Sequence, residues 1–242
     1  MKINIIIKKS GKNDLKMNFN SVDEVMTEHF TNISSLDHIC KKSIDVSLKL
    51  FTKTSKRTTM RIIETGSAAH GTKSTILFDR YLNFEQQHNN KKCSLISCDI
   101  RVNPMVDLNN KLTKLSKCVC DDSIHFLEQL ALNSKNIYDD CDLLIYLDSF
   151  DLNFADPLPS GYHGLKELIA IEPLLKKGTI LLIDDTPKSI EFCPDSQKEK
   201  AKRYLDQYGM MPGKGMFIKK VLEERSNIEL IFHEYQLLFR FN

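Results

Sequence analysis

The stretch that decides the fold is MRIIETGSAAHGTKS, residues 60–74. Its first five residues, 60–64, are mainly apolar and end in an acid, which is typical of a buried strand. Gly66 and Gly71 then enclose a turn of small residues, and the segment 75–84 carries apolar side chains on one helical stripe. A small-residue turn between a strand and a helix lets a ligand approach backbone N–H groups closely. The stretch therefore predicts a strand, a ligand-binding turn and a helix.

The same alternation continues along the chain. Mainly apolar runs recur at 94–98, 117–120, 142–147 and 179–183, and helical patterns occupy 123–132 and 162–175. The runs lack polar alternation, as strands buried on both faces do. The segment 228–241 has the pattern of one or two more strands, which fits an antiparallel addition at the end of the chain. The sequence therefore predicts an α/β fold with a doubly wound, Rossmann-like, mostly parallel seven-stranded sheet and a C-terminal antiparallel strand.

The first part of the chain differs from the rest. Residues 1–57 are polar, with two amphipathic stretches around 22–30 and 39–51. We expect residues 1–57 to form an N-terminal cap on the substrate side of the molecule. Residues 58–242 are expected to form the ligand-binding domain.

The composition excludes several classes of protein. The chain has 242 residues, with 34 lysines and arginines against 32 acids and a formal charge of +2. A nearly neutral chain has no basic field to attract nucleic acid or an anionic membrane. The longest apolar runs, 143–147 and 180–183, are far shorter than the roughly 20 residues of a membrane helix. We expect no membrane span, no nucleic-acid partner and, because the N-terminus lacks the pattern of a signal peptide, a cytoplasmic protein with a small-molecule partner.

Phosphate binding is one use of such a turn. Gly66 and Gly71 have the spacing of a P-loop, and the run 183–185 has the pattern of a Walker B strand. In a P-loop the lysine follows the second glycine directly, whereas here Thr72 stands between Gly71 and Lys73. A P-loop NTPase therefore stays as a lesser alternative.

Acids at the ends of the predicted strands indicate a different ligand. The five are Glu64, Asp99, Asp121, Asp148 and Asp184, one after each successive apolar run. Parallel sheets bind ligands at their carboxyl edge, so we expect these side chains to converge there. An acid after the first strand can receive the polar end of a nucleoside ligand, and one after the second can accept two ribose hydroxyls.

With these motifs the segment 58–242 resembles the class I S-adenosylmethionine-dependent methyltransferases. Within that class it is most similar to the metal-dependent O-methyltransferases that act on small molecules. The resemblance implies that S-adenosylmethionine is bound by Glu64, Gly66, Ser67, Gly71 and Ser74 at its methionine end, by Asp99 at the ribose, by Asp121, Asp122 and Ser123 near the adenine, and by Asp148. The four residues between Gly66 and Gly71, His70 among them, depart from the shorter spacing of the family.

The resemblance also implies a metal site. The metal-dependent enzymes hold a cation with an acid after the fourth strand and an acidic pair after the fifth, which here are Asp148, Asp184 and Asp185. Three carboxylates suit Mg²⁺, or Mn²⁺ or Ca²⁺. The alternative is that Asp184 and Asp185 cap the next turn, with Asp185 paired to a basic neighbour, in a metal-free transferase.

The reaction would also need a group that accepts a proton from the acceptor hydroxyl. Asp151 and His163 are the candidate catalytic residues, because both follow strand ends that carry the acids. The expected activity is transfer of a methyl group from S-adenosylmethionine to a hydroxyl of a small molecule. The sequence is also compatible with a homodimer. The alternative from another functional class is a non-catalytic protein of the same fold that binds S-adenosylmethionine or a nucleotide.

Overall fold

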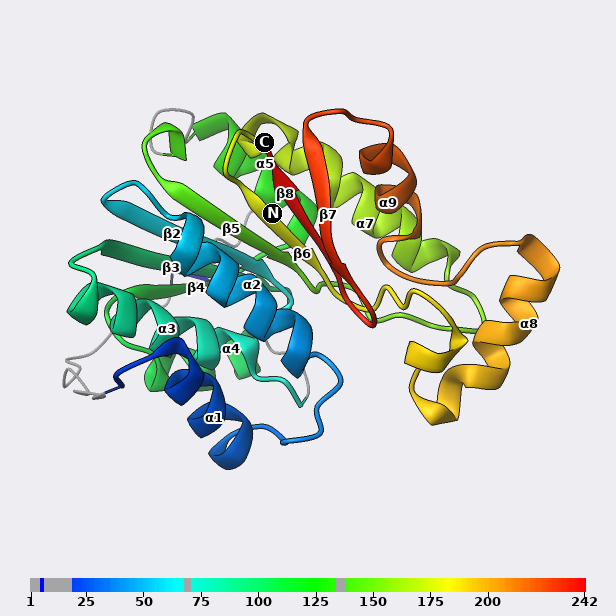
Figure 1. Ribbon diagram of the computed structural model, residues 1–242, viewed down its shortest axis with the longest axis horizontal. Coiled ribbons are helices and arrows are strands. Elements are labelled where there is room, and N and C mark those ends of the chain that lie inside the picture. Colours follow the sequence, from blue (N-terminus) through cyan, green and yellow to red (C-terminus); the bar gives the residue numbers. More distant parts are fainter. Residues whose placement is uncertain (1–4, 7–18, 68–70, 134–137) are drawn as a thin grey trace.

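The computed structural model describes residues 5–6, 19–67, 71–133 and 138–242 (Figure 1). One sheet of strand order β1-β4-β3-β2-β5-β6-β8-β7 runs through the described residues. The strands are β1 (Ile5–Ile6), β2 (Thr59–Thr65), β3 (Lys92–Asp99), β4 (Ser116–Cys120), β5 (Asp142–Leu147), β6 (Ile180–Ile183), β7 (Ile228–His233) and β8 (Leu237–Phe241). Strands β2 to β6 are parallel, and β8 is antiparallel to β6 and β7. The predicted sheet is confirmed, and the short β1, antiparallel to β4, adds an eighth strand that the sequence pattern does not predict.

Strand β2 lies at the reversal of the fold. It pairs with β3 on one side and with β5 on the other. The chain therefore runs outward from β2 to β4 and then returns to build β5 and β6 on the opposite side. Open α/β sheets bind ligands at such a reversal, outside the carboxyl ends of the strands. The topology thus places a site beside the carboxyl ends of β2 and β5.

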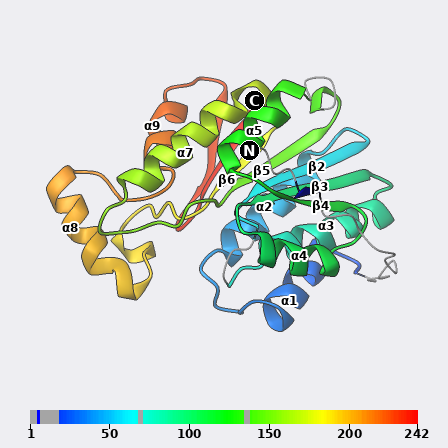
Figure 2. The ribbon, with the colours of Figure 1, turned by 180° about the vertical axis from the view of Figure 1, so that it is seen from behind.

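Helices cover both faces of the sheet, and Figure 2 shows them from behind. One face is covered by α1 (Val22–Asn32), α2 (Lys41–Thr54), α3 (Ser74–His88) and α4 (Val102–Lys111), and the other by α5 (Ser123–Asn133), α7 (Leu158–Ile171) and α9 (Met216–Glu223). Helix α8 (Lys198–Tyr208) lies beyond the sheet at one end of the molecule (Figure 1). Short 3₁₀ helices occupy Glu172–Leu174, Ile190–Phe192 and Asp195–Gln197. Within the described ranges, none of the helices is both long and apolar enough to cross a membrane.

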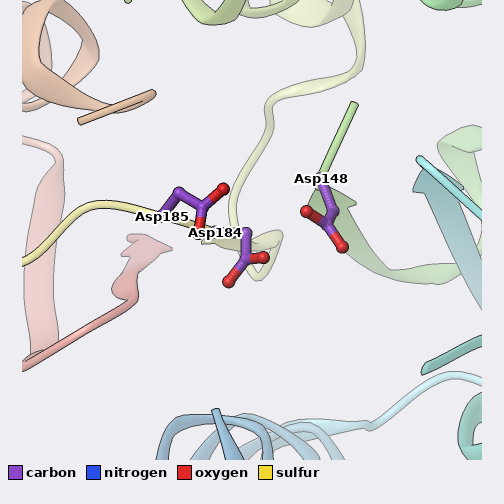
Figure 3. Close-up of side chains that lie close together, drawn as sticks. All are labelled: Asp148, Asp184 and Asp185. Carbon is purple, nitrogen blue, oxygen red and sulfur yellow. The ribbon is translucent and has the colours of Figure 1, made fainter. Parts of the chain in front are cut away.

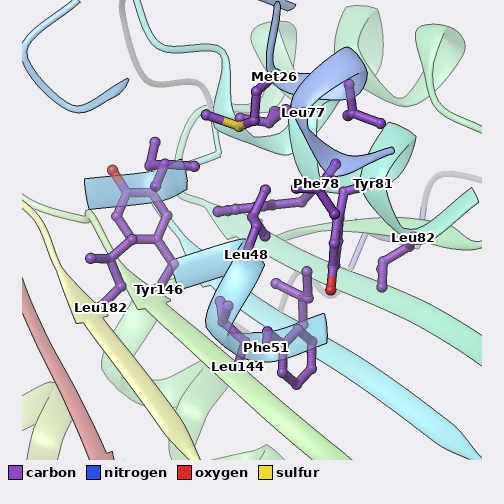
Figure 4. Packing of buried hydrophobic residues seen from close by; sticks show 14 of the residues in the cluster. Met26, Leu48, Phe51, Leu77, Phe78, Tyr81, Leu82, Leu144, Tyr146 and Leu182 are labelled. Atoms are coloured by element: carbon purple, nitrogen blue, oxygen red, sulfur yellow. The ribbon is translucent and has the colours of Figure 1, made fainter. Parts of the chain in front are cut away.

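Alternate residues of the central strands enter two separate cores. In β5, Leu144 and Tyr146 join the core under α2 and α3, whereas Leu143 and Ile145 join the core under α5 and α7. Every residue of β5 is buried, which explains why its sequence is continuously apolar. Figure 4 shows the first core, where Phe78 meets Tyr146 edge-on with 5.6 Å between ring centroids.

The two N-terminal helices pack into the first core. Phe30 of α1 and Phe51 of α2 are almost fully buried there. Helix α1 begins with a capping arrangement, in which Ser21 Oγ accepts a hydrogen bond from the Glu24 N–H and the Glu24 carboxylate accepts one from the Asn20 N–H. The sequence thus fixes the start of α1 locally, and burial of its apolar side holds it on the sheet.

Three helices differ from the sequence pattern. Helix α7 spans Leu158–Ile171 rather than 162–175, because Pro159 is tolerated in its first turn and Pro173 falls just after its end. Helices α4 and α8 are not predicted by the pattern. Each buries two side chains, Met105 and Asn109 in α4 and Ala201 and Tyr204 in α8. Neither helix therefore carries the wide apolar stripe by which a helix is identified in a sequence.

Candidate functional site

A cavity of about 490 Å³ opens at the carboxyl edge of the sheet, beside the reversal between β2 and β5. It is lined by His38, Ile39, Cys40, Gly66, Thr72, Cys98, Asp99, Ile100, Arg101, Asp121, Asp122, Ser123, Asp148, Ser149, Phe150, Asp151, His163, Asp184, Asp185 and Tyr235. Seven of these residues are aspartates, whereas the cations that pair with them are Arg101 in the lining and the buried Lys214 behind it. The excess of acids gives the cavity a negative potential, which favours a ligand that carries a positive charge.

Most of the site residues predicted from the sequence come together here. The lining includes Gly66, Asp99, Asp121, Asp122, Ser123, Asp148, Asp151, His163, Asp184 and Asp185. Glu64, Ser67, Gly71 and Ser74 do not line the cavity. His70, in the same turn, lies outside the described residues. The strand-end aspartates therefore converge as expected from the parallel topology.

Glu64 lies beneath the glycine turn rather than in the cavity. It is fully buried, and its carboxylate accepts hydrogen bonds from Ser74 Oγ and Thr75 Oγ1, each at 2.5 Å, and from Ser97 Oγ. Burial raises the pKa of Glu64, although these hydroxyls offset part of the rise. Glu64 thus ties the end of β2 to the start of α3 and to β3.

Replacing Glu64 with glutamine is expected to flatten the pH dependence of stability above pH 4.5. The raised pKa means that the folded chain holds this proton more tightly than the unfolded chain. The contribution of Glu64 to stability is therefore complete below pH 4.5 and is lost as the pH rises through the folded pKa. Urea unfolding of wild type and Glu64→Gln across this window measures the difference, with the exposed Glu199→Gln on α8 as control. Parallel curves for wild type and Glu64→Gln would contradict the expectation.

Lys73 is the lysine on which the P-loop alternative depends. Its Nζ donates a hydrogen bond to the carbonyl of Ile33 at 2.8 Å, and it does not line the cavity. The position of this side chain gives no support to phosphate binding at the turn.

Gly66 brings the turn against the end of β5. Its φ is +83°, and a Cβ built on it would lie 2.2 Å from the carbonyl oxygen of Asp148. Its N–H donates to the carbonyl of Cys98 at 2.8 Å. Only glycine combines this left-handed backbone with so close an approach of two main chains. Gly66 therefore joins the ends of three neighbouring strands at the cavity floor.

Asp99 ends β3 and is paired locally with Arg101. The guanidinium donates to both carboxylate oxygens at 3.0 Å, and the Arg101 N–H donates to Oδ1 at 2.9 Å. The Asp99 side chain is 4% exposed, whereas that of Arg101 is 45% exposed. Because Arg101 holds the carboxylate from the solvent side, a ligand that hydrogen-bonds Asp99 must share it with Arg101 or displace that side chain.

The acids after β4 are held by the start of α5. Asp122 Oδ1 accepts hydrogen bonds from the N–H groups of Ile124 and His125, each at 3.1 Å, which caps the helix. Asp121 Oδ2 lies 2.8 Å from His125 Nδ1. Both aspartates thus have fixed positions at one wall of the cavity, although each already has a partner.

His163 forms a polar cluster beside this wall. Its Nε2 lies 2.9 Å from both Ser123 Oγ and Ser149 Oγ, and Ser149 donates to the buried Glu167 at 2.7 Å. The ring stacks on Phe150 with 5.0 Å between centroids. Burial lowers the pKa of His163 below 6.5. His163 is therefore neutral near pH 7 and able to accept a proton, while Asp151, the other candidate, is exposed at the rim.

Asp148, Asp184 and Asp185 lie together at the ends of β5 and β6 (Figure 3). One carboxylate oxygen from each lies within 4.8 Å of the others. Burial raises the pKa of Asp148, and the neighbouring carboxylates of Asp184 and Asp185 raise it further. Burial also opposes ionisation of Asp184, but Lys214 and the hydrogen bond from Gln236 help to outweigh it, and the pKa of Asp184 is lowered.

Lys214 inserts its ammonium between these carboxylates. Its Nζ lies 2.8 Å from Asp148 Oδ1 and 3.1 Å from Asp185 Oδ2, and the side chain is 4% exposed. Burial opposes the charge of Lys214, but the three carboxylates raise its pKa well above 10.5. A hard divalent ion needs these oxygens free of a competing cation. The donor set, with a charged lysine among its oxygens, does not fit such an ion.

Several residues of the site are not predicted from the sequence. His38, Ile39 and Cys40 reach the cavity from the link between α1 and α2, and Lys214 reaches the acids from the loop before α9. A signal for Lys214 is present in the sequence, since it stands between Gly213 and Gly215. A Cβ on Gly213 would lie 2.9 Å from the Asp185 carbonyl oxygen, and one on Gly215 would lie 2.7 Å from Thr186 Oγ1. The two glycines thus let this loop pack directly on the end of β6.

Comparisons with known proteins give a structural likeness and no match in sequence. No model of a known protein family matches the chain, and no curated protein matches it in sequence. Among solved structures, the chain is similar to a SAM-dependent methyltransferase from Anabaena variabilis, with 12% sequence identity and a TM-score of 0.47 over 93% of this chain and 96% of that one. What the cavity binds therefore has to follow from its own residues.

Proposed function

We propose that this chain is an S-adenosylmethionine-dependent methyltransferase that acts on a hydroxyl of a small molecule. The observation that carries the proposal is the position of Asp99, Asp121 and Asp148, which end three strands around the reversal of the sheet and face one cavity. Such a crevice suits a nucleoside, with a carboxylate at the end of the second parallel strand for the ribose. The excess of aspartates around the cavity over the cations Arg101 and Lys214 complements the sulfonium charge of S-adenosylmethionine.

Different lining residues would contact different parts of S-adenosylmethionine. Asp99 would accept hydrogen bonds from the two ribose hydroxyls, and the wall of Asp121, Asp122 and Ser123 would flank the adenine. Gly66 would let the methionine end approach the turn, and Asp148 would bound it from β5. These assignments are supported by the shared cavity lining. Glu64, buried below the turn, would act through the position of α3 rather than by contact with the ligand.

Part of the cavity rim is apolar, and we assign the acceptor to that part. Ile39, Ile100 and Phe150 line it and are 41%, 72% and 51% exposed. We take the described residues 19–57 of the N-terminal segment as the substrate-side cap, because His38 to Cys40 share this rim. An apolar rim above a negative floor favours a neutral or cationic acceptor with an apolar body over an anionic one.

Bound S-adenosylmethionine would supply an electrophilic methyl group. The chain would hold the acceptor oxygen in line with that group and exclude water from it. His163, neutral and bonded to Ser123 and Ser149, would take the hydroxyl proton on Nε2, with Asp151 as the alternative base. We assign no step to a divalent cation, because Lys214 already pairs with the carboxylates that would bind it.

Calorimetric titration with S-adenosylmethionine, S-adenosylhomocysteine and ATP tests the proposal. We expect saturable binding of both sulfur nucleosides and none of ATP. Binding of ATP alone would overturn the proposal in favour of a nucleotidase. Binding of S-adenosylmethionine without transfer of labelled methyl to any of a panel of phenols and sugars would favour the non-catalytic alternative.

Asp99→Ala is expected to weaken binding of S-adenosylhomocysteine by about 10- to 100-fold, the effect of removing hydrogen bonds to a charged group. The matched control is Arg101→Ala, which removes the guanidinium beside Asp99 but leaves the carboxylate. Its affinity should equal or exceed that of wild type, because the ligand no longer competes with the guanidinium. Equal losses in the two variants would show that the pair acts as a structural unit and would contradict the role given to Asp99.

A further inference from the structure

Protein donors occupy most of the oxygens of the three carboxylates at the ends of β5 and β6. Asp148 Oδ1 accepts from Lys214 and Oδ2 from Tyr146 OH at 3.3 Å. Asp185 Oδ2 pairs with Lys214, and its Oδ1 accepts from Tyr235 OH. For Asp184, Oδ1 accepts from Gln236 Nε2 and from Cys40 Sγ. Five of the six carboxylate oxygens thus have a protein donor.

Backbone contacts also fix the loop that carries Lys214. The Lys214 N–H donates to the carbonyl of Asp185 at 2.9 Å, and the Gly215 N–H donates to Thr186 Oγ1 at 2.9 Å. On the other side, a Cβ on Gly164 of α7 would lie 2.5 Å from the Lys214 carbonyl oxygen. The loop is therefore held between β6 and α7, and the side chain has little room to leave the cluster.

The ammonium also joins two strand ends. Besides both carboxylates, Lys214 Nζ lies 3.2 Å from the backbone carbonyl of Asp148. Asp148 in turn packs on Gly66 through the same carbonyl. One buried cation therefore connects the ends of β5 and β6 at the floor of the cavity.

We propose that Lys214 is the resident cation of the Asp148, Asp184 and Asp185 cluster and takes the place of the divalent ion that the resemblance to metal-dependent O-methyltransferases implies. Lys214 is a positioning residue, since it fixes the carboxylates and does not line the cavity. The wild-type chain consequently has no divalent-cation site at these residues, and removal of the ammonium creates one. This inference is independent of the proposed function, because it concerns cation binding and not methyl transfer.

Electron paramagnetic resonance titration of Mn²⁺ tests the inference directly on the unmodified chain. We expect no saturable Mn²⁺ site in wild type tighter than about 1 mM, the weak end of protein sites for hard cations. Saturable binding below that value, lost in Asp185→Asn, would overturn the inference. This measurement decides the matter even where a variant of Lys214 does not fold.

Lys214→Ala adds a second readout. With the ammonium gone, the three carboxylates form a vacant acidic site, and Mn²⁺ should bind at least about 10-fold more tightly than to wild type, because like-charge repulsion is removed. Mn²⁺ and Mg²⁺ should also raise the melting temperature of this variant and leave that of wild type unchanged. The control is Lys219→Ala on α9, whose lysine is 37% exposed. A folded Lys214→Ala that binds Mn²⁺ no better than wild type would contradict the proposal.

Discussion

Replacing Lys214 with methionine should lower the free energy of unfolding by about 3–5 kcal/mol, the usual effect of removing one partner of a buried ion pair. Methionine keeps most of the volume of the side chain, so the loss reports the charge and its hydrogen bonds. Asp148 and Asp185 would lose a partner 2.8 Å and 3.1 Å away while remaining largely buried. Urea unfolding at neutral pH, followed by circular dichroism, measures the change.

The control for this prediction is Lys219→Met, which removes an exposed lysine paired at 3.5 Å with Glu223, one turn further along α9. That change should cost less than about 0.5 kcal/mol, as exposed pairs of this spacing do. The deficit of Lys214→Met should shrink as the pH falls, because protonation neutralises carboxylates whose folded pKa is raised by burial and by the missing cation. Adding Asp185→Asn should restore part of the loss. A deficit below about 1 kcal/mol at neutral pH would show that these carboxylates are not neutralised mainly by Lys214.

The sequence predicts the sheet because its strands are buried on both faces. Runs such as 142–147 and 179–183 have no polar alternation and stand between helical patterns, a combination that few other folds require. The parallel topology then brings Asp99, Asp148 and Asp184 to one edge without any further information. The convergence of the strand-end aspartates was therefore predictable from order and spacing alone.

The sequence does not predict in which direction each strand-end side chain points. Glu64 lies on the same face of β2 as Met60 and Ile62, under α3, and so it points into the protein. The serines and threonine that satisfy it come from α3 and β3, and their hydroxyls become partners only once the helix is packed. An acid at the end of a strand can thus serve the fold or the ligand, and the sequence does not distinguish the two.

The site residues that the sequence does not predict are those whose partners lie far away along the chain. Lys214 meets Asp148 across 66 residues of chain, and His38 reaches the cavity from a polar link between two helices. No local sequence pattern predicts either contact, because each depends on how separate helices pack on the sheet. The sequence left open whether Asp185 is a metal ligand or the partner of a basic residue, and the geometry favours the basic partner.

Replacing Gly66 with alanine is the second change from which we expect a large effect. A non-glycine residue at φ +83° is strained by about 1–3 kcal/mol, and the added Cβ would lie 2.2 Å from the carbonyl oxygen and 2.5 Å from the carbonyl carbon of Asp148. Forcing an atom into a packed region costs about a further 1–3 kcal/mol. Because the clash is with backbone on both sides, no rotamer change relieves it. Gly66→Ala should therefore lose about 2–6 kcal/mol of unfolding free energy and, if it folds, should lose S-adenosylhomocysteine binding as the end of β5 shifts.

Gly178→Ala separates the two causes of that loss. Gly178 has a similar φ of +92°, but nothing lies within 4 Å of the position of its Cβ. This variant should therefore show the backbone strain alone, about 1–3 kcal/mol, and should bind S-adenosylhomocysteine as wild type does. The difference between the variants measures the contact of Gly66 with Asp148. Equal losses of stability would mean that the ends of β2 and β5 can separate at little cost, and the cavity floor would then not depend on Gly66 for its shape.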